Sequence, residues 1–322
     1  MEDIQAFASK MAEHKQKAVF FLTLPLWQCV LNLIGSSNNP LVMEGEAYEA
    51  GKLFDNDKNI GEQSAWSYQM QLAVYFGELT LAKELCDKLL KLGGSNEWHY
   101  FACARTFFFG LIGVDLYRKH RKRKYKQLAQ KMAAKLKKWT TAGGINCLHK
   151  YLILKAELAS IKGAVDEVKT DGDSSINDIR RIYDVAISSS QRSGFGQDAA
   201  LANERAGEYL LRLRKEGDLD DPNDYYWPEI YITRAHRLYS EWGALAKANE
   251  LSKRRSDLIE SQSRKKSYHK KGSNMQGRQR FDDLSYLARE KESSAHRKIG
   301  FRFSAVSSSM QSFSASVVNS TS

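Results

Sequence analysis

The residues best suited to chemistry are cations gathered in one short segment. Between residues 117 and 140 the sequence has eleven Lys and Arg and no Asp or Glu. A helix with cations on nearly every face cannot be packed in a core, because a buried unpaired charge is costly, so we expect the first part of this segment to lie in water. Such a patch suits phosphate groups, anionic lipid or an acidic partner. The candidate binding residues are Arg118, Lys119, Arg121, Lys122, Arg123, Lys124 and Lys126.

A second interpretation of this segment requires no ligand. The helix would be solvated and would face the acidic surface of the rest of the protein. No aromatic residue alternates with the cations, as a stacking surface for nucleic acid would require. Farther along the segment, an apolar stripe at helical spacing predicts that this half docks on neighbouring helices. The stripe consists of Tyr125, Leu128, Met132, Leu136 and Trp139.

The patterns of known catalytic and metal sites are missing. The segment Gly45 to Lys52 has one residue too many for a phosphate-binding loop, and Leu53 stands where the hydroxyl belongs. Asp171, Asp173 and Asp178 lack the glycine and glutamate of a calcium loop. The seven His form no zinc-binding pattern. We therefore expect a protein that is not an enzyme and that holds no cofactor or metal.

The net charge of +11 hides an uneven distribution. Residues 253–302 hold 15 basic and 6 acidic side chains, whereas residues 1–116 and 141–252 together hold 23 basic and 32 acidic ones. The sequence therefore predicts an acidic body with two basic attachments. In the second attachment, Lys265-Lys266 and Lys270-Lys271 suggest a nuclear-import or polyanion-binding segment.

The longest apolar run, Ala18 to Ile34, is interrupted by polar residues and is shorter than the roughly 20 residues of a membrane span. The acidic start Glu2-Asp3 argues against a signal peptide. We expect a soluble cytoplasmic protein without a membrane span.

Cysteine usage favours a reducing compartment. The four cysteines have no C-x-x-C spacing and are predicted to be buried apolar side chains: Cys29, Cys86, Cys103 and Cys147.

The elements that must position these residues are helices. Proline is scarce, and apolar residues recur at helical spacing up to residue 258, so we predict an all-α protein. Turns expected near Gly77, Gly113, Gly163 and Gly217 divide the helices into hairpins, in a degenerate tetratricopeptide-like solenoid. The predicted hairpins pair 64–76 with 79–92, 98–116 with 117–139, 146–161 with 175–190, and 199–213 with 225–242, followed by a capping helix at 244–258.

These elements suggest three regions. Residues 1–62 form N-terminal helices and a connector, residues 63–258 form the repeats, and residues 259–322 form a disordered tail that is first basic and then rich in serine. The last twenty residues include nine Ser, which predicts phosphorylation of the tail.

Several stretches resemble a known family. The run Ser193 to Glu204 and the later run Tyr239 to Ala244, followed by Lys247, are similar to the end of the helical-repeat region of multidomain AAA or STAND-type signalling ATPases. Leu24 to Gln28 resembles the start of the same region. In those proteins an ATPase domain precedes the repeats, and a histidine kinase or nucleotide cyclase follows them. The matching residues are Gly194, Phe195, Asp198, Asn203, Glu204, Tyr239, Trp242, Gly243 and Lys247.

The resemblance implies packing and turns at these positions. Gly194 and Gly243 fall where helices end, which favours a residue that tolerates positive φ. Asn203 and Glu204 lie on an otherwise small and apolar helix, and they either hydrogen-bond across the array or face water. Any ATPase, kinase or cyclase activity of the family would lie outside this chain.

Two functions remain open at this stage. The first is a non-catalytic scaffold for protein–protein interaction in signal transduction, which binds an ATPase or a kinase or cyclase output module, in cis or in trans. The second is a free-standing adaptor that holds a polyanion, nucleic acid or an anionic membrane, through residues 118–126 and the tail.

Overall fold

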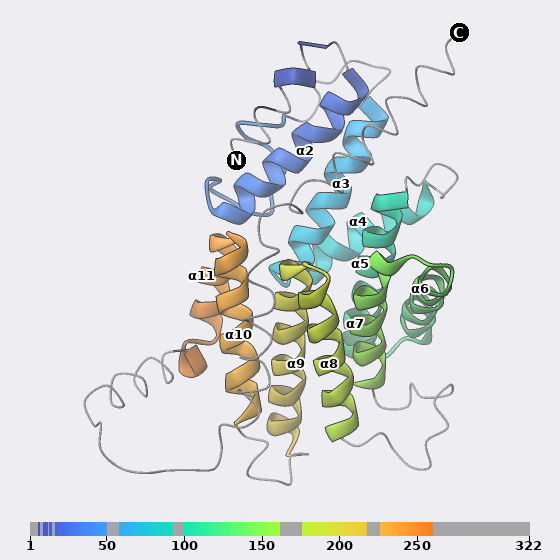
Figure 1. Ribbon diagram of the computed structural model, residues 1–322, viewed down its shortest axis with the longest axis vertical. Coiled ribbons are helices and arrows are strands. Elements are labelled where there is room, and N and C mark those ends of the chain that lie inside the picture. Colours follow the sequence, from blue (N-terminus) through green and yellow to red (C-terminus); the bar gives the residue numbers. More distant parts are fainter. Residues whose placement is uncertain are drawn as a thin grey trace, which may run out of the picture. The chain divides into compact units, whose positions relative to one another are not determined.

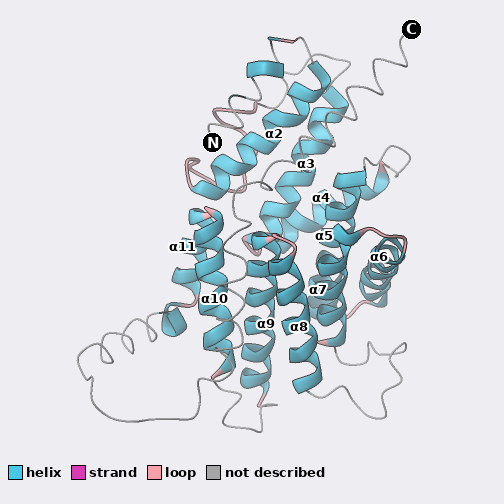
Figure 2. Ribbon diagram, viewed as in Figure 1, coloured by secondary structure: helices cyan, strands magenta, loops and turns pink. Residues whose placement is uncertain are grey.

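The structure is a computed structural model of the 322-residue chain. It describes residues 6, 9–11, 13–14, 17–49, 58–92, 99–161, 176–217 and 226–259. Within these ranges the protein is all-α, as predicted, and contains no strand (Figure 2). The predicted tail, the lysine pairs at 265–271, Asp171 and Asp173 lie outside the described residues.

Most helices begin and end close to the predicted positions, and several end at a glycine with positive φ. Gly77, Gly194, Gly217 and Gly243 all have φ between 77° and 92°. In this left-handed region a side chain is strained, so glycine stops the helix and allows the chain to reverse. The helices are α2 (Lys17–Ile34), α3 (Lys58–Tyr75), α4 (Leu79–Lys91), α5 (His99–His120), α6 (Arg123–Thr141), α7 (Leu148–Ala159), α8 (Ile176–Arg192), α9 (Gly196–Glu216), α10 (Trp227–Trp242) and α11 (Leu245–Arg254), with a short 3₁₀ turn, η1 (Ile145–Cys147), before α7.

One predicted hairpin is wrong in its turn. The turn expected at 116–117 lies instead at Arg121 and Lys122, between α5 and α6. Arg121 adopts φ 55° there, so a residue other than glycine reverses the chain. Gly113, expected in a turn, is helical; a Cβ at this position would lie 2.9 Å from the backbone oxygen of Tyr125 and 3.0 Å from the backbone nitrogen of Ala129. Its role is therefore to let α5 and α6 approach closely.

Successive helices pack against one another. Helices α7, α8, α9 and α10 form a row, each beside the next, and α5 and α6 form a close pair beside α7 (Figure 1). Most of the buried apolar side chains belong to one continuous core along these helices, which includes Phe107, Leu111, Ile153 and Tyr183. Apolar burial of this extent is the main stabilising contribution to such a fold.

The last described helix returns to the first part of the chain. Helix α11 packs against α2, and Ala244, which precedes α11, joins a second apolar cluster with Cys29 and Leu72. The ring of Tyr75 on α3 also lies 6.1 Å from that of Tyr239 on α10. In a strictly linear array each repeat contacts only its neighbours, so these contacts are a departure from that pattern.

Two buried amides hold the segment that follows α2. Gln28 donates a hydrogen bond to Asn32, and its own side-chain oxygen accepts one from the backbone N–H of Ala47. Asn32 in turn donates to the carbonyl oxygens of Pro40 and Val42. These polar interruptions of the apolar run therefore fix residues 40–47 against α2.

No helix in the described ranges is both long enough and apolar enough to cross a membrane.

Candidate functional site

The turn between α5 and α6 carries the exposed cations that the sequence predicts. Lys119, Arg121, Lys122, Arg123 and Lys124 are all exposed, and none of them forms an ion pair within the described part of the chain. We call these five residues the basic turn. Arg121 lies 5.9 Å from the centre of the Tyr117 ring, and Lys124 lies 5.0 Å from that of Tyr125. Lys126, at the next turn of α6, is half-buried.

Arg118 does not stand in water, contrary to the prediction. Its guanidinium lies 2.7 Å from the Glu157 carboxylate and 3.1 Å from that of Asp115, and it also donates to the hydroxyl of Ser160. Arg118 comes three residues after Asp115, on the same face of α5, so it points inward while the residues that follow it turn outward. The charge-paired burial of Arg118 removes it from the candidate polyanion site.

Arg118 belongs to a buried ionic cluster that joins α5, α7, α8 and α9. Arg205 of α9 forms two parallel hydrogen bonds of 2.7 Å with Asp115, and Tyr183 of α8 donates one of 2.8 Å to Glu157. A bidentate contact of this kind is the strongest arrangement of an arginine with a carboxylate. We call Asp115, Arg118, Glu157, Tyr183 and Arg205 the central ion network.

The charges of the central ion network stabilise one another. Burial alone would raise the pKa of Asp115 and of Glu157, but the adjacent Arg205 and Arg118 hold both below their usual values. Burial, with the Glu157 carboxylate beside it, raises the pKa of Tyr183 far above its usual value. All five groups therefore keep their ordinary charge states at neutral pH.

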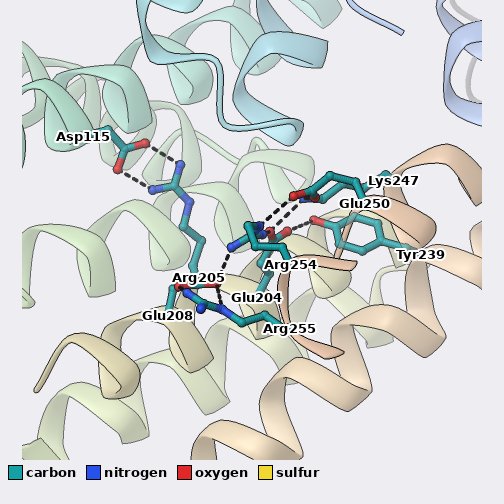
Figure 3. A network of polar contacts seen from close by, with 9 residues as sticks. All are labelled: Asp115, Glu204, Arg205, Glu208, Tyr239, Lys247, Glu250, Arg254 and Arg255. Carbon is teal, nitrogen blue, oxygen red and sulfur yellow. Dashed lines mark hydrogen bonds and ion pairs between the residues drawn. The ribbon is translucent and has the colours of Figure 1, made fainter. Parts of the chain in front are cut away.

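A second cluster is made by residues that the resemblance singled out (Figure 3). Lys247 of α11 is fully buried, and its ammonium lies 2.8 Å from Glu204 of α9. The hydroxyl of Tyr239 of α10 donates a 2.8 Å hydrogen bond to the other Glu204 oxygen. We call Glu204, Tyr239 and Lys247 the motif cluster. It ties together the last three helices of the described chain.

The motif cluster extends to the surface through further ion pairs. Arg254 reaches Glu204, Glu208 and Glu250, each within 2.5 to 2.7 Å, and Arg255 pairs with Glu208. Burial alone would raise the pKa of Glu204, but Lys247 and Arg254 hold it below the usual range. Of the two predicted alternatives for Glu204, it therefore hydrogen-bonds to neighbouring helices and does not face water.

Asp198, another motif residue, is buried in a third polar group. It accepts hydrogen bonds from His149 and Lys150 of α7, and the ring of Phe195 stacks on His149 at 4.3 Å. Lys150 and His149 outweigh the effect of burial and lower the pKa of Asp198. Phe195 and Asp198 therefore join the start of α9 to α7.

The other motif residues have structural positions. Gly194 and Gly243 have the positive φ that was expected. Asn203 is buried and donates to the Ala199 carbonyl of its own helix. Trp242 remains 40% exposed while its ring packs near Tyr75.

The described residues include no group of three or more metal-ligating side chains that could hold an ion. An open groove of about 710 Å³ lies where α11 meets the segment after α2. Phe76, Pro40 and Ala246 supply apolar surface, and Asn249 and Lys253 supply polar groups. The hydroxyl of Ser37, which also lines the groove, is buried and lacks a hydrogen-bond partner among the described residues.

Sequence reasoning missed Asp115, Glu157, Tyr183 and Arg205. The one available signal was compositional: charged residues inside otherwise apolar helices must be paired when they are buried. Apart from the Asp115–Arg118 pair on α5, their partners lie 26 to 90 residues away in the sequence, so spacing along a single helix does not reveal them.

Comparison with known proteins finds no matching family model, no matching curated protein and no matching solved structure.

Proposed function

We propose that the chain is a non-catalytic helical scaffold for protein–protein interaction in signal transduction, and that it is part of, or derived from, a multidomain signalling ATPase. The observation that supports this most directly is the motif cluster. Glu204, Tyr239 and Lys247 were singled out by resemblance alone, yet their side chains meet in one buried ionic contact. In this proposal the hairpins are a degenerate tetratricopeptide-like array whose last members are fastened by these residues.

The groove beside α11 is the surface we assign to the partner. It combines apolar surface at Phe76 and Pro40 with the exposed cation Lys253, which forms no ion pair in the described ranges. A partner segment that fits would present an apolar side chain to Phe76 and a carboxylate to Lys253.

Two measurements test this function. An antibody against residues 195–258 would be used on cells that contain the protein; a band well above 36.6 kDa is expected if an ATPase is joined in cis. A photo-reactive amino acid at Asn249, which is exposed in the groove, is expected to crosslink an ATPase, kinase or cyclase partner in trans. The same group at Lys131, exposed on α6, is the matched control. A band at 36.6 kDa together with no such partner at Asn249 would refute the proposal.

The basic turn favours a second function, the binding of a polyanion. Its five cations have no carboxylate partner in the described part of the chain, and Arg123 and Lys124 occupy the first turn of α6. A helix N-terminus carries partial positive charge, so cations there repel it and an anion would relieve the repulsion.

Salt dependence and a matched pair of variants test the polyanion function. The probe is a labelled single-stranded DNA 20-mer, with anionic vesicles as a separate arm. Substituting Lys122, Arg123 and Lys124 by Gln should weaken DNA binding and reduce the salt slope by about 2, since each single-strand phosphate contact contributes about 0.7. The control substitutes Lys131, Lys137 and Lys138, three exposed cations of the same helix. Equal losses in both variants would contradict a site at the basic turn.

A further inference from the structure

Two cysteines that are far apart in the sequence meet in space. The sulfur of Cys103, in the second turn of α5, lies 2.7 Å from the sulfur of Cys147, at the end of η1. A disulfide bond is about 2.05 Å long, so the two sulfurs need to approach by roughly 0.7 Å. Cys103 is half-buried and Cys147 is 8% exposed. The prediction of isolated apolar cysteines does not describe this pair.

We propose that Cys103 and Cys147 are a dithiol site that a peroxide oxidises to an intramolecular disulfide. The bond would join the start of α5 to the start of α7. The reaction takes place between elements that already pack together, so neither helix has to move far.

The other two cysteines show what a cysteine without this arrangement looks like. Cys29 and Cys86 are buried, neither contacts a second thiol in the described ranges, and burial raises the pKa of each to about 12. Without a second thiol within reach, neither can form an intramolecular disulfide in the folded chain. They are internal controls for the proposed site.

The surroundings assign different roles to the two sulfurs. Cys147 is the N-cap residue of α7. Burial, followed by the hydrogen bond with Cys147, raises the pKa of Cys103, and the nearby ammonium of Lys150 acts in the opposite direction. Because its pKa is raised, Cys103 keeps its proton until the second step, which leaves the first attack to Cys147.

The chemistry balances with hydrogen peroxide as the oxidant. The Cys147 thiolate attacks one peroxide oxygen, the O–O bond breaks, and a sulfenic acid and hydroxide form. The Cys103 sulfur then attacks the sulfenic sulfur, the S–S bond forms, and the sulfenic oxygen leaves as water with the Cys103 proton. In total, two thiols lose two hydrogen atoms and one peroxide becomes two waters. A dithiol reductant such as dithiothreitol reverses the product by exchange.

The test uses the full chain, reduced and then treated with hydrogen peroxide before alkylation and mass spectrometry. Before alkylation, we expect an intact mass two daltons lower than that of the reduced chain. After alkylation, we expect two labelled thiols, Cys29 and Cys86, and a crosslinked peptide pair that contains Cys103 and Cys147. Dithiothreitol should restore four alkylatable thiols.

Variants separate the pair from general oxidation. The double variant Cys29→Ser with Cys86→Ser should still form the crosslink, whereas Cys103→Ser should stop at a sulfenic acid on Cys147 that a dimedone probe traps. The proposal is overturned if the wild-type chain keeps four alkylatable thiols under peroxide, or if Cys29 or Cys86 appears in crosslinks as often as the proposed pair. The wild-type result depends on no variant, so misfolding of one does not affect the conclusion.

Discussion

Replacing Lys247 by methionine removes the charge at the centre of the motif cluster and keeps most of the side chain's length. The wild-type ammonium makes two charged contacts, 2.8 Å to Glu204 and 2.6 Å to Glu250. Removing one partner of a buried ion pair typically costs about 3–5 kcal/mol, because the other charge stays buried. Glu204 keeps Arg254 and Tyr239, and Glu250 is partly exposed, so we place the cost at the lower end, about 3 kcal/mol.

The assay is urea unfolding followed by circular dichroism at pH 7, with two companion variants. Adding Glu204→Gln to Lys247→Met removes the carboxylate that was left behind, so the double variant should recover about 1–2 kcal/mol. The control Lys83→Met breaks the exposed Lys83–Asp87 pair of α4 and should cost no more than about 0.5 kcal/mol. The reasoning is refuted if Lys247→Met costs less than about 1 kcal/mol, or if adding Glu204→Gln only increases the loss.

Three further predictions concern stability. Gly113→Ala should cost about 1–3 kcal/mol in the free energy of unfolding, because the added Cβ meets the backbone of α6. The control Gly196→Ala, where a Cβ has no atom within 4 Å, should be neutral or stabilising. Equal effects of the two variants in urea titrations would contradict the close approach of α5 and α6. Tyr183→Phe should lower the free energy of unfolding by about 1–3 kcal/mol, because Glu157 loses one hydrogen bond. The control Tyr226→Phe, at an exposed position, should leave the urea midpoint unchanged. If Tyr183→Phe also leaves it unchanged, Tyr183 does not contribute to the central ion network. The free energy of unfolding should fall as the pH is lowered below about 4, because five carboxylates of the described residues have pKa values in the folded state below those of the unfolded chain. Their stabilisation is complete above the unfolded values and is lost as the pH falls through the folded ones. A series of urea titrations from pH 7 to pH 3 measures this, and a flat profile would contradict it; the carboxylates are Asp115, Glu157, Asp198, Glu204 and Glu208.

The helix boundaries were predictable where a glycine ends the helix. Glycines after α3, α8, α9 and α10 have the positive φ that ends a helix, and apolar spacing located the helices between them. The α5–α6 turn was missed because Arg121, a residue that rarely adopts positive φ, makes the reversal. Gly113 was wrongly predicted to lie in a turn, because its small size allows two helices to pack closely and does not reverse the chain.

The candidate sites were predictable only in part. The exposed cations of the basic turn follow from charge density, since six positive charges in seven residues cannot share one buried face. The prediction of exposure was wrong for Arg118, because this arginine at the edge of the run pairs with two carboxylates, one of them on another helix. Asp115 and Arg205 are 90 residues apart, and only the packing of α5 against its neighbours brings them together.

The contact between α11 and α2 limits how this chain can change. A helical array with free ends can gain or lose a hairpin at little cost, because the units beyond the change simply move with it. Here Ala246 lies beside Gly35, and Ala244 shares an apolar cluster with Cys29 of α2. A hairpin added between α2 and α11 would therefore separate these helices and expose that cluster. The contact between α11 and α2 thus constrains insertions between these two helices, and loss of packing at one of them is transmitted to the other.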